Sequence, residues 1–199
     1  IPSGGAAKGD PAWFEKYATR IAGLERPAIV NMVVCPQNVA RLTENFTYIL
    51  RHGLRRINIL PAFYVEWSQA QLMELRAALK KLAALIDRLW RDAFPLEIQN
   101  MQVNVDKPLF SGGLLLDCDG GIYPGDIAML FEPGEGRRRF SLGNVNELAD
   151  LDKLGGNSIK VDEKALLGRF SAAALASTAQ ADAELSRFVA ALELARKTN

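Results

Sequence analysis

Two cysteines and one histidine are the side chains of this sequence with the widest chemical range. Cys35 and Cys118 are far apart and neither belongs to a CxxC pair, so a zinc site or a disulfide framework has little support. His52 directly precedes Gly53 at a predicted helix end, where its positive form would meet the negative end of the helix dipole. We therefore interpret His52 as a capping residue rather than a catalytic one.

A group of aspartates could in principle bind calcium. Asp117, Asp119 and Asp126 surround an Asp-Gly turn, but no bidentate Glu follows at the spacing of an EF-hand loop. Their spacing fits turn chemistry better than metal binding. We expect no metal ligands in this chain.

Polar and aromatic residues at one short predicted strand are the better candidates for binding. Asn58 lies among apolar residues, so its amide either faces solvent or serves a ligand or a backbone group. Tyr64, Glu66 and Trp67 follow as an aromatic and acidic loop that could contact a substrate. Alternatively, Trp67 packs in front of the helix cap at Ser68.

Helices and strands alternate along the first part of the chain. Strands are predicted at residues 28–35, 55–61 and 96–105, and the first is an apolar run broken only by Asn31, as expected for a strand buried on both faces. Amphipathic helices precede each strand. One begins at Asp10-Pro11, one ends at Gly53, and one begins with a capping box at Ser68.

This order predicts an α/β fold with parallel strands joined by helical crossovers. Function in such folds lies at the carboxyl ends of the strands, here near Cys35, Leu60 and Val103. Three strands cannot close a barrel, so we expect a partial (β/α) barrel with an open edge. We expect that edge to be covered by self-association or by the C-terminal helices.

The pattern changes after Asp106, and we place a domain boundary there, with a barrel part at 1–106 and a tail at 107–199. Residues 114–124 contain an apolar strand, an Asp-Gly turn and a second strand, which predicts a β-hairpin extension. Two C-terminal helices are expected beyond Val161. The second carries an apolar stripe with no assigned partner, made of Leu185, Phe188, Val189 and Leu192.

Several segments in this order resemble the radical S-adenosylmethionine superfamily. The segments are Val33–Val39, Gly53 with Arg56–Ala62, Trp67-Ser68, then Asp117–Pro124 and Leu142–Val145. The first part is similar to the second half of that family's barrel, and the second part to the auxiliary-cluster (SPASM-like) extension of peptide-modifying members. The resemblance implies S-adenosylmethionine and a [4Fe-4S] cluster as cofactors, and a parent oxidoreductase that forms a 5′-deoxyadenosyl radical to modify a peptide or a small metabolite.

Two departures from the family pattern limit what this chain could do alone. The defining CxxxCxxC is absent from the sequence, and Gly125 stands where the tail motif usually has cysteine. We therefore expect a fragment that is inactive and binds no cofactor by itself, with the missing half of the barrel as its partner. The alternative is a non-catalytic α/β binding or interaction module.

The resemblance also implies which residues line the cavity at the strand ends. On the cofactor side these are Val34, Cys35, Asn58, Leu60, Pro61 and Gln102, and on the substrate side Tyr64, Glu66 and Trp67. For Val34 and Leu60, core packing is the alternative interpretation.

Composition narrows the remaining classes. The 199 residues are 49% hydrophobic and 24% charged, with a formal net charge of +1, as in ordinary globular proteins. The densest basic run, Arg137–Arg139, is too short for a broad nucleic-acid footprint. No apolar stretch approaches the roughly 20 residues that cross a bilayer, and no signal peptide is evident, so we expect a cytoplasmic protein.

Overall fold

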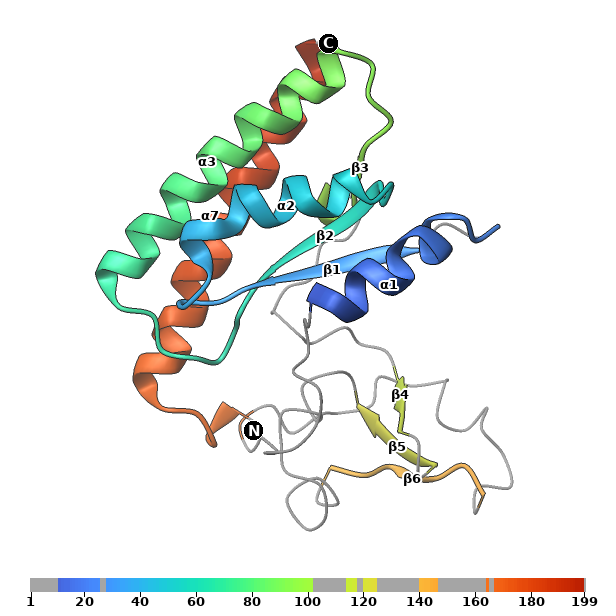
Figure 1. Ribbon diagram of the computed structural model, residues 1–199. Coiled ribbons are helices and arrows are strands. Elements are labelled where there is room, and N and C mark those ends of the chain that lie inside the picture. Colours follow the sequence, from blue (N-terminus) through green and yellow to red (C-terminus); the bar gives the residue numbers. More distant parts are fainter. Residues whose placement is uncertain are drawn as a thin grey trace.

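The computed structural model describes residues 11–25, 28–101, 114–117, 120–124, 140–146, 164 and 167–198. Within these residues, two small sheets and four α-helices are arranged as Figure 1 shows. The larger α/β unit carries the candidate site, and the second sheet follows it in the chain. The predicted boundary after residue 106 lies outside the described residues and stays a prediction.

The first sheet is parallel and has the predicted order. Strands β1 (Ile29–Val34), β2 (Arg56–Pro61) and β3 (Glu97–Ile98) lie in the order β1-β2-β3. Asn31 pairs with Asn58, and Arg56 pairs with Glu97. The predicted parallel arrangement is therefore confirmed, and the carboxyl ends of β1 and β2 lie together at one edge.

Helices α1 (Pro11–Ala22), α2 (Leu42–Arg51) and α3 (Gln69–Arg91) begin and end where local chemistry indicates. Ser68 accepts a hydrogen bond from the backbone of Gln71, whose side chain accepts one from the Ser68 backbone, so the predicted capping box is present. Gly53 has φ +83°, the left-handed conformation expected after a helix. His52 occupies the C-cap position of α2, where its backbone N–H donates to Ile49 and Leu50, and its ring contacts Phe14. The position is the predicted one, and the interaction of its positive form with the helix dipole stays a prediction.

Strand β1 is buried on one face only, so the prediction that it is buried on both faces is wrong. Met32 and Val34 are 7% and 1% exposed and pack against the helices, whereas Ile29 and Val33 are 48% and 55% exposed. An apolar run has the same pattern whether or not a second layer covers it. The described residues place helices against only one face of this sheet.

Strand β3 is much shorter than the predicted 96–105, because a side chain takes over its pairing. After Ile98 the chain turns into a 3-10 helix, Gln99–Met101. Asn100 then accepts a hydrogen bond from the Ile59 backbone N–H at 2.8 Å and donates one to the Ile59 carbonyl at 2.8 Å. The amide thus reproduces the two bonds that a longer strand would make. Residues 102–105 lie outside the described part of the chain.

We expect Asn100→Ala to lower the free energy of unfolding by about 1–3 kcal/mol, because it leaves two backbone groups of the buried Ile59 without partners. Chemical denaturation followed by circular dichroism measures this. Asn45→Ala on α2, for which no side-chain bond is seen within the described residues, is the matched control. Equal midpoints for the two variants would show that water or another group replaces the Asn100 amide.

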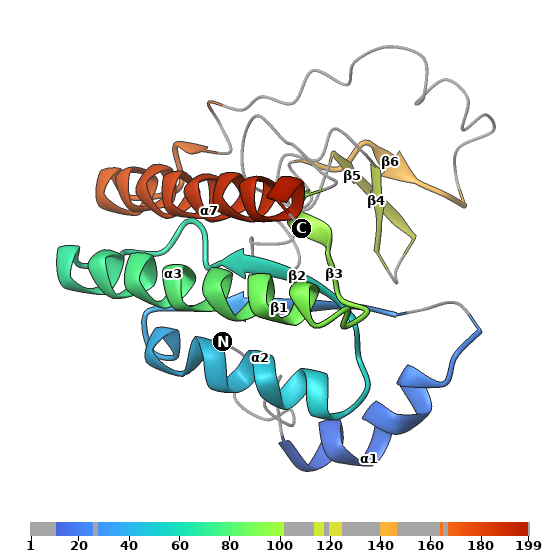
Figure 2. The ribbon, with the colours of Figure 1, turned by 90° about the horizontal axis from the view of Figure 1, so that it is seen from above.

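One long helix, α7 (Ala172–Thr198), covers the region where two C-terminal helices were predicted. It is the second of them, and the first falls largely on residues outside the described part. Figures 1 and 2 show α7 beside α3, and both helices run in the same direction. Phe188 and Leu192 are 3% and 0% exposed within the core that contains β1 and β2. The apolar stripe therefore has its partner in this chain, and self-association through the sheet edge stays a prediction.

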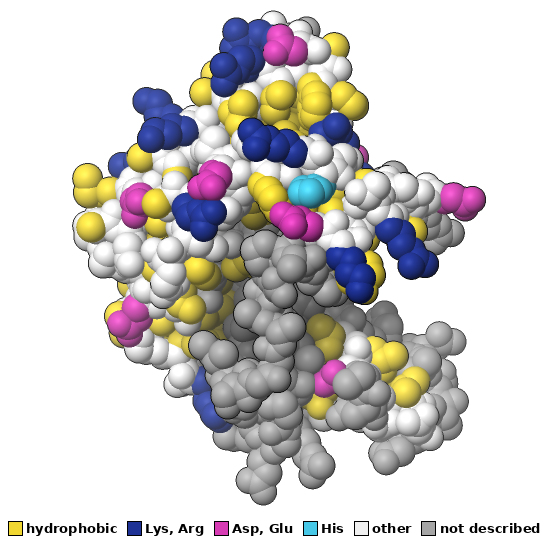
Figure 3. Space-filling view, viewed as in Figure 1, with side chains coloured by type: hydrophobic (Ala, Val, Ile, Leu, Met, Phe, Trp, Pro, Cys, Tyr) yellow, Lys and Arg dark blue, Asp and Glu magenta, His cyan; other side chains and the backbone are white. Residues whose placement is uncertain are grey.

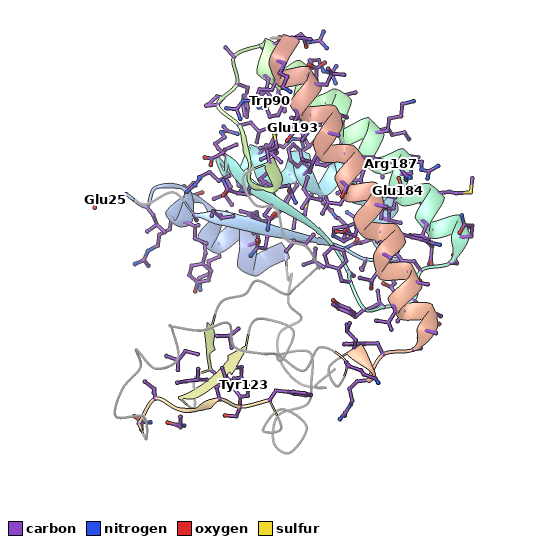
Figure 4. All side chains as sticks on the ribbon, turned by 180° about the vertical axis from the view of Figure 1, so that it is seen from behind. Glu25, Trp90, Tyr123, Glu184, Arg187 and Glu193 are labelled. Atoms are coloured by element: carbon purple, nitrogen blue, oxygen red, sulfur yellow. The ribbon has the colours of Figure 1, made fainter. Side chains whose placement is uncertain are left out.

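A buried carboxylate ties α7 to α3. Glu184 is 7% exposed and accepts hydrogen bonds from Arg76, the shortest 2.6 Å, and from Arg187 one turn further along α7 (Figure 4). The hydrogen bonds from Arg76 lower the pKa of Glu184, which burial alone would raise, and Arg187 lowers it further. Because this pKa is depressed in the folded state, the ion pair supports the fold at neutral pH and ceases to do so in acid.

The predicted hairpin is confirmed and gains a third strand. Strands β4 (Leu114–Leu116), β5 (Gly121–Pro124) and β6 (Gly143–Asn144) form an antiparallel sheet in that order. Gly120 in the turn has φ +82°, and a Cβ there would lie 2.8 Å from the Asn144 side chain. The two tail motifs therefore meet in one sheet, and the turn requires glycine. Cys118, Asp119 and Asp126 lie outside the described residues.

The surface carries dispersed charge. On the face seen in Figure 3, the described Lys and Arg side chains stand in small separate groups with Asp and Glu among them. In the described part of the chain, no helix has the length and apolar character needed to cross a membrane.

Candidate functional site

The face of the parallel sheet that points away from the helices is the candidate site. Alternation along the strands places Ile29, Asn31 and Val33 of β1 on this face. Arg56, Asn58 and Leu60 of β2 lie opposite them in register. The face therefore consists of a charged row, an amide row and an apolar row, with the apolar row nearest the carboxyl ends.

The amide row is joined by a side-chain hydrogen bond. Asn58 Nδ2 donates to Asn31 Oδ1 at 3.0 Å. Each amide has further donors and acceptors beyond this one bond. Because the pair lies at the surface beside the apolar row, it can bind hydroxyl or ring nitrogen groups while Val33 and Leu60 contact the face of a ring.

The charged row is already paired within the chain. Arg56 Nε donates to Glu97 Oε2 at 2.8 Å, and Arg56 Nη2 donates to Glu97 Oε1 at 3.2 Å. This ion pair lies at the amino-terminal end of the strands, and it occupies the charged groups of that row. The amide row and the apolar row remain as the part that can receive a ligand.

A short turn follows β1 at the carboxyl edge. Asn38 Oδ1 accepts a hydrogen bond from the Cys35 backbone N–H at 2.8 Å, and Asn38 Nδ2 donates to the Val33 carbonyl at 3.2 Å. Cys35 is a half-buried free thiol. The Asn38 side chain therefore fixes the turn that follows β1. Cys35, in this turn, lies beside the candidate site.

The loop after β2 is divided between buried and exposed side chains. Tyr64 and Trp67 are 9% and 5% exposed, and the indole Nε1 of Trp67 donates to the Ala62 carbonyl at 2.9 Å. Glu66 is exposed and accepts a hydrogen bond from Ser171 Oγ at 2.7 Å. Of the three residues predicted to bind substrate, only Glu66 is displayed at the surface. Trp67 packs beside the Ser68 cap, as the alternative interpretation proposed.

The residues predicted on the cofactor side fall into four groups. Asn58 and Leu60 lie on the open face. Val34 and Pro61 lie on the opposite, helix-facing side and are buried, which matches the packing interpretation for Val34. Cys35 lies just beyond β1, and Gln102 lies outside the described residues.

Sequence reasoning missed two residues of the amide row and the apolar row, Asn31 and Val33. Asn31 is the single polar residue in the β1 run, and Asn58 is the single amide in the β2 run. One amide in an otherwise apolar run, in each of two strands predicted to pair, was a signal that could have found Asn31. To use it, one must know the register of the two strands, which places Asn31 directly beside Asn58.

A pocket of about 610 Å³ lies at the opposite end of the sheet, among the described residues. Its lining includes Leu54, Arg55, Trp90 and Arg196, near the carboxyl ends of α2, α3 and α7. The Arg55 guanidinium lies 4.2 Å from the Phe94 ring centre and donates to the Leu50 carbonyl of α2. Arg55 thus bonds a carbonyl at the end of α2. The pocket meets the candidate face at the charged row, because Arg56 and Glu97 also line it, and it does not include the amide row or the apolar row.

Comparison with known proteins identifies a fold neighbour. A solved structure of a histidine-tagged protein, described as "anSMEcpe with bound AdoMet", is similar to this chain, with a TM-score of 0.53 and 14% sequence identity. The match covers 94% of this chain and 57% of that chain, so this chain spans little more than half of its neighbour's length. No family model matches the sequence, and no curated protein matches it significantly. The comparison therefore shows that this chain has an α/β fold similar to part of that neighbour.

Proposed function

We propose that this chain is part of a radical S-adenosylmethionine enzyme and that its open sheet face holds the adenosyl portion of S-adenosylmethionine. The parent enzyme forms a 5′-deoxyadenosyl radical that abstracts hydrogen from a peptide or a small metabolite. The observation that carries the proposal is the Asn31–Asn58 pair on the face of the parallel sheet that the described helices leave uncovered. The neighbour with bound AdoMet supports the same class of ligand.

The chemistry of the open face fits an adenosyl group. Ribose hydroxyls and adenine nitrogens need hydrogen-bond donors and acceptors, which the two amides supply. The adenine ring needs apolar contacts, which Val33 and Leu60 at the carboxyl end of the sheet can supply. In this proposal, the protein residues bind and orient the ligand, and the radical chemistry belongs to the cofactor.

The residues of this chain do not fit an iron-sulfur cluster. A cluster of this type is held by several thiolates, and the whole sequence has two cysteines. We propose that the cluster cysteines belong to a segment outside these 199 residues, which completes the barrel along the edge of β1 that no described strand pairs with. The chain alone is then inactive, and the sequence that encodes the rest of the protein is expected to contain CxxxCxxC. From the sequence, we expected this chain to bind no cofactor by itself. We now apply that expectation to the iron-sulfur cluster only, and we propose that the chain still binds the adenosyl group.

Asn58→Leu is expected to weaken S-adenosylmethionine binding roughly tenfold, because the variant loses a polar contact to the adenosyl group. Isothermal titration calorimetry with the full chain measures the dissociation constant. Asn45→Leu on α2 is the matched control and should leave the affinity unchanged. If Asn58→Leu binds as tightly as the native chain, or if the native chain shows no saturable binding, the open face is not the adenosyl site.

The purified chain is expected to remain colourless after anaerobic reconstitution with iron and sulfide, because two cysteines cannot hold a [4Fe-4S] cluster. Absorbance and iron content after desalting measure this. Broad absorbance near ~400 nm with stoichiometric iron, the usual sign of thiolate-held clusters, would contradict the assignment of the cluster to another segment.

A further inference from the structure

The loop after β2 is attached to the C-terminal helix through two neighbouring hydroxyl groups. Thr178 Oγ1 accepts a hydrogen bond from the Tyr64 backbone N–H at 2.6 Å. Ser177 Oγ accepts one from the Trp67 backbone N–H at 3.1 Å. The four residues come from parts of the chain more than a hundred residues apart, and these contacts are buried.

The helix alone does not account for both hydroxyl groups, because only Thr178 also bonds a carbonyl of α7. Ser177 and Thr178 are 6% and 5% exposed, on a helix whose other buried positions are mainly apolar. Buried hydroxyl groups destabilise a protein unless they are hydrogen-bonded. Here they serve the two loop N–H groups, and Thr178 also donates to the Ala174 carbonyl at 2.9 Å. Their position is therefore matched to the loop.

The loop conformation is one that needs outside support. Tyr64 has φ +62°, a left-handed conformation that tyrosine rarely adopts. Its ring stacks on Phe170 with centroids 4.6 Å apart, at the entry to α7. Strained backbone of this kind persists where the surrounding structure holds it. The Thr178 bond to the Tyr64 N–H acts directly at the strained residue.

We infer that Ser177 and Thr178 are positioning residues that preorganise the loop at the carboxyl end of β2 and so set the ligand contacts of the candidate site. They turn Tyr64 and Trp67 inward and leave Val65, 39% exposed, and Glu66 displayed outward. Only the ligand part of this inference rests on the proposed function. The attachment of the loop is a property of the fold.

Native-state hydrogen exchange on the full chain tests the attachment. Protection of the Tyr64 and Trp67 amides should fall roughly tenfold or more in Thr178→Val and Ser177→Ala, because a buried donor that loses its acceptor is strongly destabilised. Amides of Leu79 and Leu82 in α3 should keep their protection. Ser186→Ala, at an exposed position of the same helix, is the matched control. Unchanged loop protection, or an equal loss in the loop and in α3, overturns the inference.

Titration with S-adenosylmethionine tests the consequence for the site. Thr178→Val should weaken binding several-fold, and Ser186→Ala should not. If the loop is released in Thr178→Val but the affinity is unchanged, the loop does not position the ligand and the inference fails. If the native chain binds no S-adenosylmethionine while the exchange result holds, the proposed function fails and the attachment of the loop stands.

Discussion

Phe188→Ala is expected to lower the free energy of unfolding by about 3–5 kcal/mol, because it removes a buried aromatic side chain and leaves a cavity. Phe188 is 3% exposed on α7 and belongs to the same core as β1 and β2. The loss therefore weakens the contact between the C-terminal helix and the sheet-bearing half of the protein. Urea denaturation monitored by tryptophan fluorescence measures the change.

The same helix supplies a control for Phe188→Ala. Leu194 is 67% exposed, so Leu194→Ala removes an apolar side chain from α7 without opening a cavity. Its effect should stay within about 0.5 kcal/mol, as for ordinary surface substitutions. If both variants lose stability equally, the loss comes from a change in helix propensity rather than from lost packing. That result would contradict the packing of α7 on the core.

Trp67→Ala is expected to destabilise the protein by a similar amount, about 3–5 kcal/mol. The indole is 5% exposed, and its Nε1 donates to the Ala62 carbonyl. Truncation removes the packing and leaves that carbonyl without its partner. The thermal unfolding midpoint, measured by differential scanning calorimetry, should fall by roughly 6–20 °C relative to the native chain, at about 2–4 °C per kcal/mol for a chain of this size.

The neighbouring Glu66 provides the contrast, because both residues were predicted to contact substrate. Glu66 is exposed, and its one described bond is to Ser171. Glu66→Ala should change stability by no more than about 1 kcal/mol. If Trp67→Ala is as stable as the native chain but binds the ligand differently, Trp67 contacts the ligand and its structural role is contradicted.

Local chemistry was sufficient to predict the elements themselves. Ser68 with Gln71 specifies the start of α3, and Gly53 specifies the end of α2, because caps depend on residues a few positions apart. The alternation of helices with short apolar runs predicted a parallel sheet, since parallel neighbours need a crossover between them. The hairpin at Gly120 followed from its Asp-Gly turn in the same way.

The length of β3 depended on a distant contact. Its sequence is compatible with further strand, but the Asn100 amide bonds the Ile59 backbone and ends the ladder. These two residues are 41 positions apart, so no local sequence pattern could predict the bond between them. The same holds for Tyr64 and Trp67, whose backbone N–H groups donate to Thr178 and Ser177 on α7.

The sequence by itself therefore determined where the main helices and strands begin and the parallel order of the first sheet, but not the length of β3, because caps, turns and periodicity act over a few residues. The tertiary structure alone decided which face of β1 is covered and which side chains meet there. Asn31 and Asn58 are 27 residues apart and become partners only through the register of β1 and β2. A side chain's neighbours depend on the packing of whole layers, and the candidate site consists of those neighbours.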